Sequence, residues 1–415
     1  MSAAIEWTLS RRNRGLKTEH PENETTRPRP MRIALVAEKF WPFSGPTEVH
    51  LGELAVELDR HGHMIQILTS KLDKTWPGLL DFREIPIHRI VNGSGPWATL
   101  RNARRFGKHL RGIEGLDSLL VFGINTVTWA VLRTMGHQIP VVVFVDRSLL
   151  ESGTLNQIPQ RQIEALKRAR AVITNCPELA SHLLQLPGMP SVQVIPIGVN
   201  AVEKPPSLSS QSGARAALSE AHPILGVDAG QPLAITSLTR NNDEGILDII
   251  GAWSTVVEQY PGAKLWIVGD GQLAAKAWQR IVKLNLVHSV ILPGFFDEDS
   301  GILLAADLYI YSFRTPRADP MLIRAMANQR CVLATSNGWT ESFITPNENG
   351  LLAPANRPAA LAEAILLAFA KSDLRSRLAN GALQTAKLHF SLGDQARRVL
   401  ELLQKPAEQP CESAP

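Results

Sequence analysis

The chain has 415 residues, of which 44% are hydrophobic and 20% charged, a composition typical of a globular protein with two or three domains. Its formal net charge of +4 is too small to indicate a nucleic-acid partner, and no apolar run reaches the roughly 18–20 residues that span a bilayer. The three cysteines lack the spacing of metal ligands or of a disulfide framework, so we expect no metal site and a reducing cytoplasm.

Residues 1–30 are polar and rich in Arg, Glu, Thr and Pro. They offer too little apolar surface to offset the entropy lost on ordering, so we predict a disordered tail without a secretory signal. The folded part is expected to begin at Met31, because Arg32–Ala37 is a short apolar run typical of a strand buried on both faces of a parallel sheet.

Strand and helix patterns then alternate. Leu51, Leu54, Ala55 and Leu58 share one face of a helix, and the apolar run 64–68 predicts the next strand, which completes a βαβ unit. The pattern recurs with strands at 118–122, 141–145, 171–174 and 192–196 and helices at 127–135 and 160–168. Residues 31–200 are therefore predicted to form an N-terminal Rossmann-like domain.

A second α/β half follows the segment 201–230, which is rich in Ser, Pro, Ala and Gly and is predicted to be a linker with room for one short helix. Residues 231–388 repeat the alternation and form the predicted C-terminal Rossmann-like domain. Its expected strands lie at 233–237, 263–268, 290–292, 308–311 and 331–334. Residues 389–404 are predicted to form a C-terminal helix, a candidate to cross back to the N-terminal domain, and 405–415 a tail.

Several segments, in this order and spacing, resemble retaining nucleotide-sugar glycosyltransferases of family 4. They are the strand and loop 31–48, Val194–Asn200, Leu265–Gly271, Pro293–Phe295, Ala325–Ala327 and Asn349–Pro354. The resemblance covers about residues 31–403. It implies an α/β fold of two Rossmann-like domains facing a cleft, the GT-B architecture. It also implies a nucleotide-diphosphate sugar as donor, a glycan or lipid-linked acceptor in envelope or polysaccharide biosynthesis, and no cofactor besides the donor.

The departures from the family pattern fall on the donor site. Family members carry two glutamates eight positions apart, and here these positions hold Pro316 and Arg324. Of the family's basic pair, which neutralises the donor diphosphate, the lysine is replaced by Glu244 and the arginine by Thr239, with Arg240 as the nearest substitute. Sugar transfer from a nucleotide builds negative charge on the leaving diphosphate, so Glu244 is expected to repel it. Arg240 and Arg324 together are expected to clamp it.

Two carboxylates are candidates for contact with the reacting sugars. Asp146 stands where the family has a histidine, and it is equally suited to cap the following turn. Asp319 is the carboxylate nearest to the missing glutamate, and it is also placed to cap the helix that begins near Met321. Trp339 replaces a glycine and is expected to crowd a ligand. The other predicted contacts are Gly45, Arg240, Gly269, Gly271, Phe295, Arg324, Gly338 and Glu341.

Three functions remain open at this level. The first is an active glycosyltransferase with a rearranged donor site. The second is a catalytically impaired relative that serves as a binding or partner subunit. The third is another reaction on the same fold, such as epimerisation of a nucleotide sugar, for which the sequence carries no motif of its own.

The segment Leu100–Ile113 predicts an amphipathic helix with a strongly basic face. Apolar residues share one side, and Arg101, Arg104, Arg105, Lys108 and Arg111 crowd the other. Such a helix can dock on anionic lipid, so a peripheral location at the inner membrane face is a candidate within the expected cytoplasmic setting. The alternative is an ordinary packed helix with a solvated basic face.

Overall fold

The computed structural model describes residues 29–42, 46–91, 98–146, 159–203, 206–228, 230–239, 244–294, 296 and 300–404. By its contacts the chain divides into two compact units. The first takes the described residues up to Pro196 together with those from Gly393 onward, and the second runs from Ile197 to Leu392. The helix at the C-terminus therefore belongs to the first unit.

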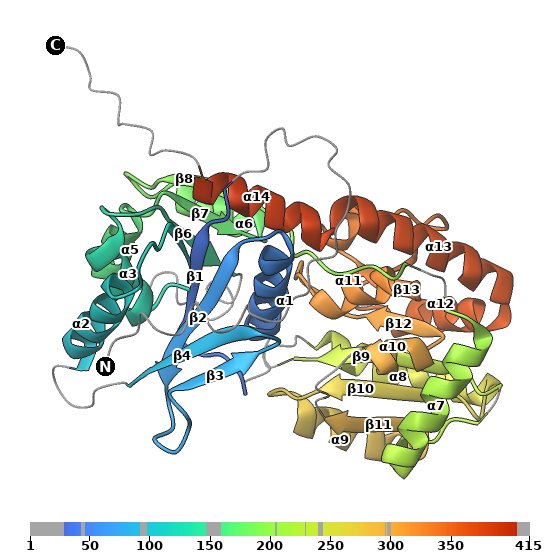
Figure 1. The fold of residues 1–415 in the computed structure, drawn as a ribbon. Coiled ribbons are helices and arrows are strands. Elements are labelled where there is room, and N and C mark those ends of the chain that lie inside the picture. Colours follow the sequence, from blue (N-terminus) through green and yellow to red (C-terminus); the bar gives the residue numbers. More distant parts are fainter. Residues whose placement is uncertain are drawn as a thin grey trace, which may run out of the picture. The chain divides into compact units, whose positions relative to one another are not determined.

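The first unit is built on an eight-stranded sheet with the order β3-β4-β2-β1-β5-β6-β7-β8 (Figure 1). All neighbouring strands run parallel except β3, which is antiparallel to β4. The strand order reverses at β1, the position beside which open α/β sheets bind ligands at their carboxyl ends. The strands are β1 (Arg32–Ala37), β2 (Met64–Lys71), β3 (Leu79–Phe82), β4 (Ile85–Val91), β5 (Ser118–Phe122), β6 (Val141–Val145), β7 (Ala171–Thr174) and β8 (Ser191–Val194).

Helices cover this sheet on both faces. On one face lie α2 (Ala98–Arg111), α3 (Thr126–Met135), α5 (Gln160–Leu166) and α6 (Pro177–Leu184), whose apolar side chains form one core with the strands. Figure 1 shows α1 (Pro46–Arg60) on the opposite face. The predicted stripe of α1 is fully buried, and α14 (Leu392–Gln404) packs beside it through a hydrogen bond between Gln395 and His50.

The hairpin β3–β4 was not predicted from the sequence. Its two-residue turn is made by Arg83 and Glu84, both with positive φ (50° and 71°). Two-residue hairpin turns usually place Gly, Asn or Asp in this conformation, so the turn lacks the usual sequence signal. Strand β3 lies at the edge of the sheet, and its burial alternates between exposed and partly buried residues.

The second unit holds a six-stranded, fully parallel sheet with the order β11-β10-β9-β12-β13-β14. The order reverses at β9, between β10 and β12, as it does at β1 in the first unit. The strands are β9 (Leu233–Leu238), β10 (Lys264–Gly269), β11 (Val290–Gly294), β12 (Leu308–Tyr311), β13 (Cys331–Ser336) and β14 (Leu351–Pro354). The nearly continuous burial of β9, β10, β12 and β13 agrees with the apolar runs from which they were predicted, whereas β14 was not predicted as a strand.

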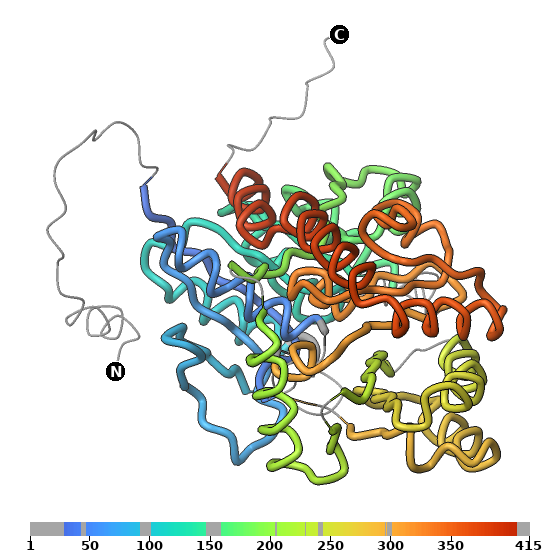
Figure 2. The backbone as a smooth tube through the Cα atoms, turned by 90° about the vertical axis from the view of Figure 1, so that its right-hand side faces the viewer, coloured from blue at the N-terminus to red at the C-terminus, as the bar shows by residue number. Residues whose placement is uncertain are grey.

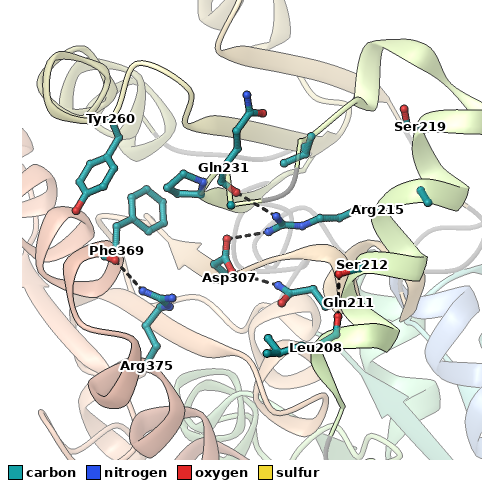
Figure 3. Close-up of a pocket in the computed structure, with 14 residues that line it drawn as sticks. Leu208, Gln211, Ser212, Arg215, Ser219, Gln231, Tyr260, Asp307, Phe369 and Arg375 are labelled. Atoms are coloured by element: carbon teal, nitrogen blue, oxygen red, sulfur yellow. Dashed lines mark hydrogen bonds and ion pairs between the residues drawn. The ribbon is translucent and has the colours of Figure 1, made fainter.

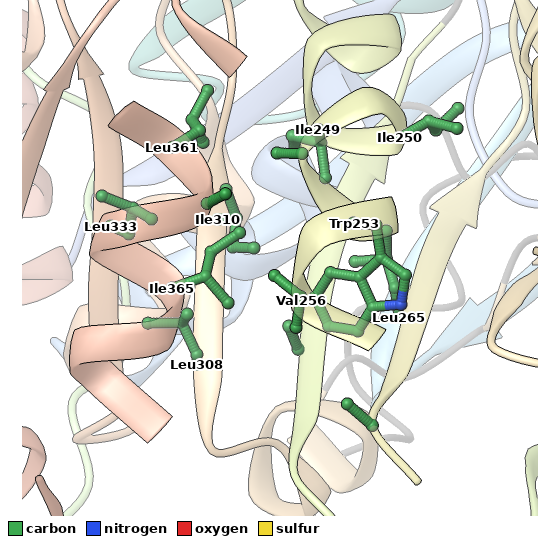
Figure 4. Packing of buried hydrophobic residues seen from close by; sticks show 14 of the residues in the cluster. Ile249, Ile250, Trp253, Val256, Leu265, Leu308, Ile310, Leu333, Leu361 and Ile365 are labelled. Carbon is green, nitrogen blue, oxygen red and sulfur yellow. The ribbon is translucent and has the colours of Figure 1, made fainter. Parts of the chain in front are cut away.

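Two helical layers enclose this sheet. One core joins α8 (Gly245–Gln259), α9 (Ala274–Lys283) and α12 (Pro358–Ala370) to the sheet, with Trp253, Ile249 and Ile365 packed between α8, α12 and the strands (Figure 4). A second core lies under α10 (Ser300–Ala305), α11 (Pro320–Ala327) and α13 (Ser372–His389). The short helices η3 (Pro223–Leu225) and η4 (Thr340–Ser342) complete the unit. Each unit is thus a three-layer α/β domain.

The segment 201–230, predicted as a linker, lies within the second unit and carries helix α7 (Leu208–Ala221), drawn in light green in Figure 2. None of the residues of α7 is fully buried, but Ala214 and Leu218 are partly buried and pack against the core of the unit. Arg215 forms an ion pair with Asp307 at 2.8 Å, and Gln211 donates to the same carboxylate at 3.1 Å. The segment thus contains the helix for which the sequence left room, with a length of 14 residues, and both polar pairs and apolar contacts attach it to the second unit.

Candidate functional site

The turn after β10 brings the backbone of the second unit to the carboxyl edge of its sheet. Gly269 has φ of +108°, and a Cβ at this position would lie 2.2 Å from the carbonyl oxygen of Leu238 on β9. Only glycine fits there. The next residue, Asp270, accepts a hydrogen bond from the amide of Gly271 at 2.7 Å, which shapes the turn. The predicted turn at Gly269 and Gly271 therefore lies where β9 and β10 end side by side.

Asp319 is buried beneath the start of α11 rather than open to a substrate. One carboxylate oxygen accepts from the amide of Met321 at 3.0 Å, and the other accepts from the hydroxyls of Tyr309 at 2.5 Å and Ser237 at 3.0 Å. Burial raises the pKa of Asp319, and these hydrogen bonds and the charge of Arg324 oppose the rise. Its partners and its burial are those of a helix cap, the structural alternative to contact with a sugar.

Arg324 lies on α11 and is half-buried. Its charge is close enough to Asp319 to lower the pKa of that carboxyl. This interaction is the structural alternative to a donor contact, and the residue remains partly exposed. Three predicted contacts, Gly45, Arg240 and Phe295, lie outside the described residues, so the arrangement of Arg240 relative to Arg324 is not described.

Glu244 takes part in an ion-pair network that the sequence did not reveal. It directly precedes α8, and its carboxylate pairs with Lys276 of α9 and with Arg314, at 3.4 Å, from the loop after β12. Arg314 also binds Asp248 through two parallel hydrogen bonds of 2.8 Å. The pKa of Glu244 is lowered, chiefly by the hydrogen bond from Lys276. The predicted repulsion is thus offset by two cations from other elements.

The loop after β13 holds the next predicted contacts. A Cβ on Gly338 would meet no protein atom within 4 Å, so no packing demand explains this glycine. The ring of Trp339 packs on Tyr311, with centroids 5.4 Å apart, and on Phe343, at 4.9 Å, and it remains partly exposed. Glu341 is exposed and accepts a hydrogen bond from Ser336.

In the first unit, Asp146 follows β6 at the carboxyl edge of the sheet. It accepts a hydrogen bond of 2.6 Å from the hydroxyl of Thr47 in the first turn of α1. At the neighbouring strand β5, Asn125 caps α3 by accepting from the amides of Val127 and Thr128. Asp146 therefore joins the end of β6 to the start of α1, close to where β1, the reversal strand, ends.

A pocket of about 610 Å³ in the second unit lies at the opposite edge of the sheet (Figure 3). Its walls include Gln231 just before β9, Asp307 just before β12, and the aromatic rings of Tyr260 and Phe369. In Figure 3 the ion pair between Arg215 and Asp307 crosses this pocket. None of the predicted site residues lines it, so this pocket is distinct from the candidate site.

Metal ligation finds no support in the geometry. Among the residues that the structure describes, no group of three or more His, Cys, Asp or Glu side chains is placed to hold a metal ion. The two described cysteines, Cys176 and Cys331, are both buried.

Sequence comparisons match both units to known families. Residues 47–203 match the family described as "Glycosyltransferase Family 4", and residues 231–371 match the family described as "Glycosyl transferases group 1". The two matches fall one on each sheet. The chain belongs to the GT-B glycosyltransferases. This confirms both the predicted fold class and the family resemblance.

Two curated glycosyltransferases are similar in sequence to parts of the chain. A Rhizobium meliloti protein, "Lipopolysaccharide core biosynthesis glycosyltransferase LpsE", is 27% identical over 135 residues, which cover 32% of this chain and 40% of that protein. The "Putative glycosyltransferase EpsD" of Bacillus subtilis is 26% identical over 220 residues, 53% of this chain and 55% of EpsD. The matched segments thus span between two fifths and just over half of these relatives.

Solved glycosyltransferase structures match nearly the whole chain. The Anabaena protein HepE, solved in complex with UDP and glucose, has a TM-score of 0.68 at 17% identity, with 91% of this chain and 100% of that chain covered. Sucrose-phosphate synthase from Thermosynechococcus elongatus has a TM-score of 0.67 at 19% identity, covering 90% and 98%. At these identities the structures establish the GT-B fold.

Proposed function

We propose that this glycosyltransferase moves a sugar from a nucleotide-diphosphate donor to a glycan or lipid-linked acceptor in envelope polysaccharide biosynthesis, with retention of anomeric configuration. The observation that carries the proposal is the match of two glycosyltransferase families, one on each parallel sheet. One relative named for lipopolysaccharide core biosynthesis, and the structural neighbour HepE, solved with UDP and with UDP-glucose, support the donor and acceptor classes. No cofactor besides the donor is proposed.

The donor is proposed to bind at the carboxyl edge of the second sheet. The Gly269–Gly271 turn allows close approach of a ligand to backbone amides, and Gly338 leaves open space beside the loop after β13. Arg324 and Glu341 are the proposed polar contacts, together with Arg240, Phe295 and Gly45 from outside the described residues. In the first unit, Asp146 is proposed to orient the acceptor hydroxyl, since its hydrogen bond to Thr47 fixes it near the end of the reversal strand.

A donor screen tests this function directly. We expect one nucleoside diphosphate to raise the melting temperature of the chain and its sugar conjugate to be slowly hydrolysed without acceptor. Arg324→Ala is expected to weaken that nucleotide's binding about tenfold, because a charge-assisted hydrogen bond contributes roughly 1.5–3 kcal/mol. Arg377→Ala, on an exposed part of α13, is the matched control.

The alternative of a catalytically impaired binding subunit predicts a different result. It is favoured if no common nucleoside diphosphate shifts the melting temperature while the protein remains folded. Binding of a nucleotide without hydrolysis or transfer of its sugar would also favour it.

We further propose that the chain docks on anionic membranes through the basic face of α2. Arg101, Arg104, Arg105, Lys108 and Arg111 are all exposed on this helix. Its apolar face, however, is not available to lipid, because Ala103, Phe106 and Leu110 are buried against the core of the first unit. Docking is therefore electrostatic and superficial rather than by insertion. No helix in the described part of the chain is long and apolar enough to cross a bilayer.

Changing Arg104, Arg105 and Lys108 together to Glu is expected to abolish co-sedimentation with vesicles that contain phosphatidylglycerol. Binding of the unaltered protein should fall as salt rises, because the interaction is screened within roughly 8–10 Å. The control changes Lys371, Arg377 and Lys387, three exposed cations of the second unit, to Glu and so alters the net charge equally. Equal sedimentation of both variants would refute docking through α2.

A further inference from the structure

A single carboxylate, that of Glu244, lies between two cations in the second unit. Lys276 pairs with one of its oxygens, and the guanidinium of Arg314 approaches the other at 3.4 Å. The three residues come from separate elements: the residue before α8, helix α9, and the loop after β12. Separate segments of the chain thus converge on one anionic group.

This convergence lies on the ligand-binding side of the sheet. Glu244 follows the loop after β9, Lys276 follows the Gly269 turn after β10, and Arg314 follows β12. These are the carboxyl ends of the three central strands, where β9 is the strand at which the order reverses. Open parallel sheets bind their ligands at this position.

The side chain of Arg314 is less exposed than that of Glu244 and is held by a further carboxylate. Arg314 is fixed by two hydrogen bonds of 2.8 Å to Asp248, whose side chain is only 11% exposed. Glu244 and Lys276 are 51% and 53% exposed, and an exposed ion pair adds little stability. Because carboxylate and phosphate oxygens accept the same charge-assisted hydrogen bonds, an incoming phosphate can displace Glu244 at low cost.

We propose that Lys276 and Arg314 bind the diphosphate of the donor, and that Glu244 competes with it as an internal anion. Asp248 then acts as a positioning residue that holds Arg314 in place. The inference rests on the proposed transferase function, and it explains how a donor site tolerates an acidic residue where the family resemblance implies a lysine. The positive charge is supplied from α9 and the β12 loop instead.

Removal of the internal anion is expected to strengthen binding. We expect Glu244→Gln to bind inorganic pyrophosphate and UDP about threefold to tenfold more tightly than the unaltered chain, measured by isothermal titration calorimetry in low salt. Lys276→Ala and Arg314→Ala should each weaken both ligands. Because a gain in affinity does not arise from misfolding, the Glu244→Gln result does not depend on equal stability of the variants.

Glu164 provides the matched control. It forms a similar exposed pair with Lys167, at 2.8 Å, on α5 of the first unit. Glu164→Gln should leave both affinities unchanged.

The inference is overturned if Glu244→Gln binds pyrophosphate no more tightly than the unaltered chain does. It is also overturned if Lys276→Ala and Arg314→Ala bind pyrophosphate as tightly as the unaltered chain. If UDP and every other nucleoside diphosphate fail to bind the unaltered chain and Glu244→Gln alike, the proposed donor itself is refuted. If nucleotides bind the unaltered chain but none of these substitutions changes their affinity, the inference fails while the proposed donor stands.

Discussion

Replacing Gly269 with alanine is expected to lower the free energy of unfolding of the second unit by about 3 kcal/mol or more. The φ of +108° strains any residue with a Cβ, and that Cβ would lie 2.2 Å from the carbonyl oxygen of Leu238. The obstructing atom belongs to the backbone of a central strand, so it cannot move aside without breaking the sheet. Urea unfolding followed by circular dichroism measures the change.

Gly338→Ala is the matched control for this substitution. An added Cβ there meets no protein atom within 4 Å, so we expect stability to change by no more than about 0.5 kcal/mol. If the donor approaches this loop as proposed, UDP affinity should nevertheless fall. A Gly269→Ala variant as stable as Gly338→Ala would show that the turn after β10 relaxes more easily than its geometry indicates.

The second large effect is expected at Asp319. Asp319→Ala removes the cap of α11 and one acceptor of the buried hydroxyls of Tyr309 and Ser237. We expect a loss of about 1.5–5 kcal/mol in the free energy of unfolding, from about 0.5–2 kcal/mol for the cap and about 1–3 kcal/mol for the lost buried hydrogen bonds. Asp319→Asn retains an acceptor for the amide of Met321 and should cost much less.

The same pair of variants gives a pH test. Because burial raises the pKa of Asp319, the folded chain binds this proton more tightly than the unfolded chain does. The contribution of Asp319 to stability is therefore fully present below the carboxyl's ordinary pKa of 3.8 and is lost as the pH rises through the raised value. Asparagine does not titrate, so the stability of Asp319→Asn relative to the unaltered chain should increase with pH above about 4. A constant or decreasing difference would contradict a raised pKa.

If Asp319 instead contacted a sugar, Asp319→Asn would abolish transfer while leaving unfolding unchanged at every pH. Preserved nucleotide binding in Asp319→Asn, together with the pH-dependent stability difference, distinguishes the cap from a catalytic group. Thermal unfolding and nucleotide titration at matched pH values measure both properties.

Much of the architecture follows from local sequence patterns. Apolar runs such as Arg32–Ala37 and Leu233–Leu238 are buried nearly throughout, as strands covered on both faces must be. The hairpin β3–β4 was not predicted because Arg83 and Glu84 adopt positive φ, a conformation that hairpin turns usually give to Gly, Asn or Asp. Helix α7 lies where the sequence left room for one short helix, but its attachment to the second unit includes an ion pair, Arg215–Asp307, between residues 92 positions apart, which no local pattern indicates.

The candidate site was predictable only where a residue's role depends on its own backbone. Gly269 was singled out from the sequence as a glycine turn after a buried strand, and its φ of +108° and its close contact with Leu238 of the neighbouring strand β9 both require glycine. Asp319 was assigned two roles, and its burial and its partners Ser237 and Tyr309, from two other strands, favour the helix cap. The sequence offered no means of measuring that burial.

The sequence by itself determined the alternation of strands and helices, the family, and the positions at which this chain departs from the family pattern. Only the tertiary structure decided the consequence of Glu244, because its partners Lys276 and Arg314 lie 32 and 70 residues away. Hydrophobic periodicity indicates which face of a helix or strand is buried, and it depends only on residues close together in the sequence. Electrostatic pairing depends on which strand ends the sheet order brings together, and that order is set by packing of the whole domain.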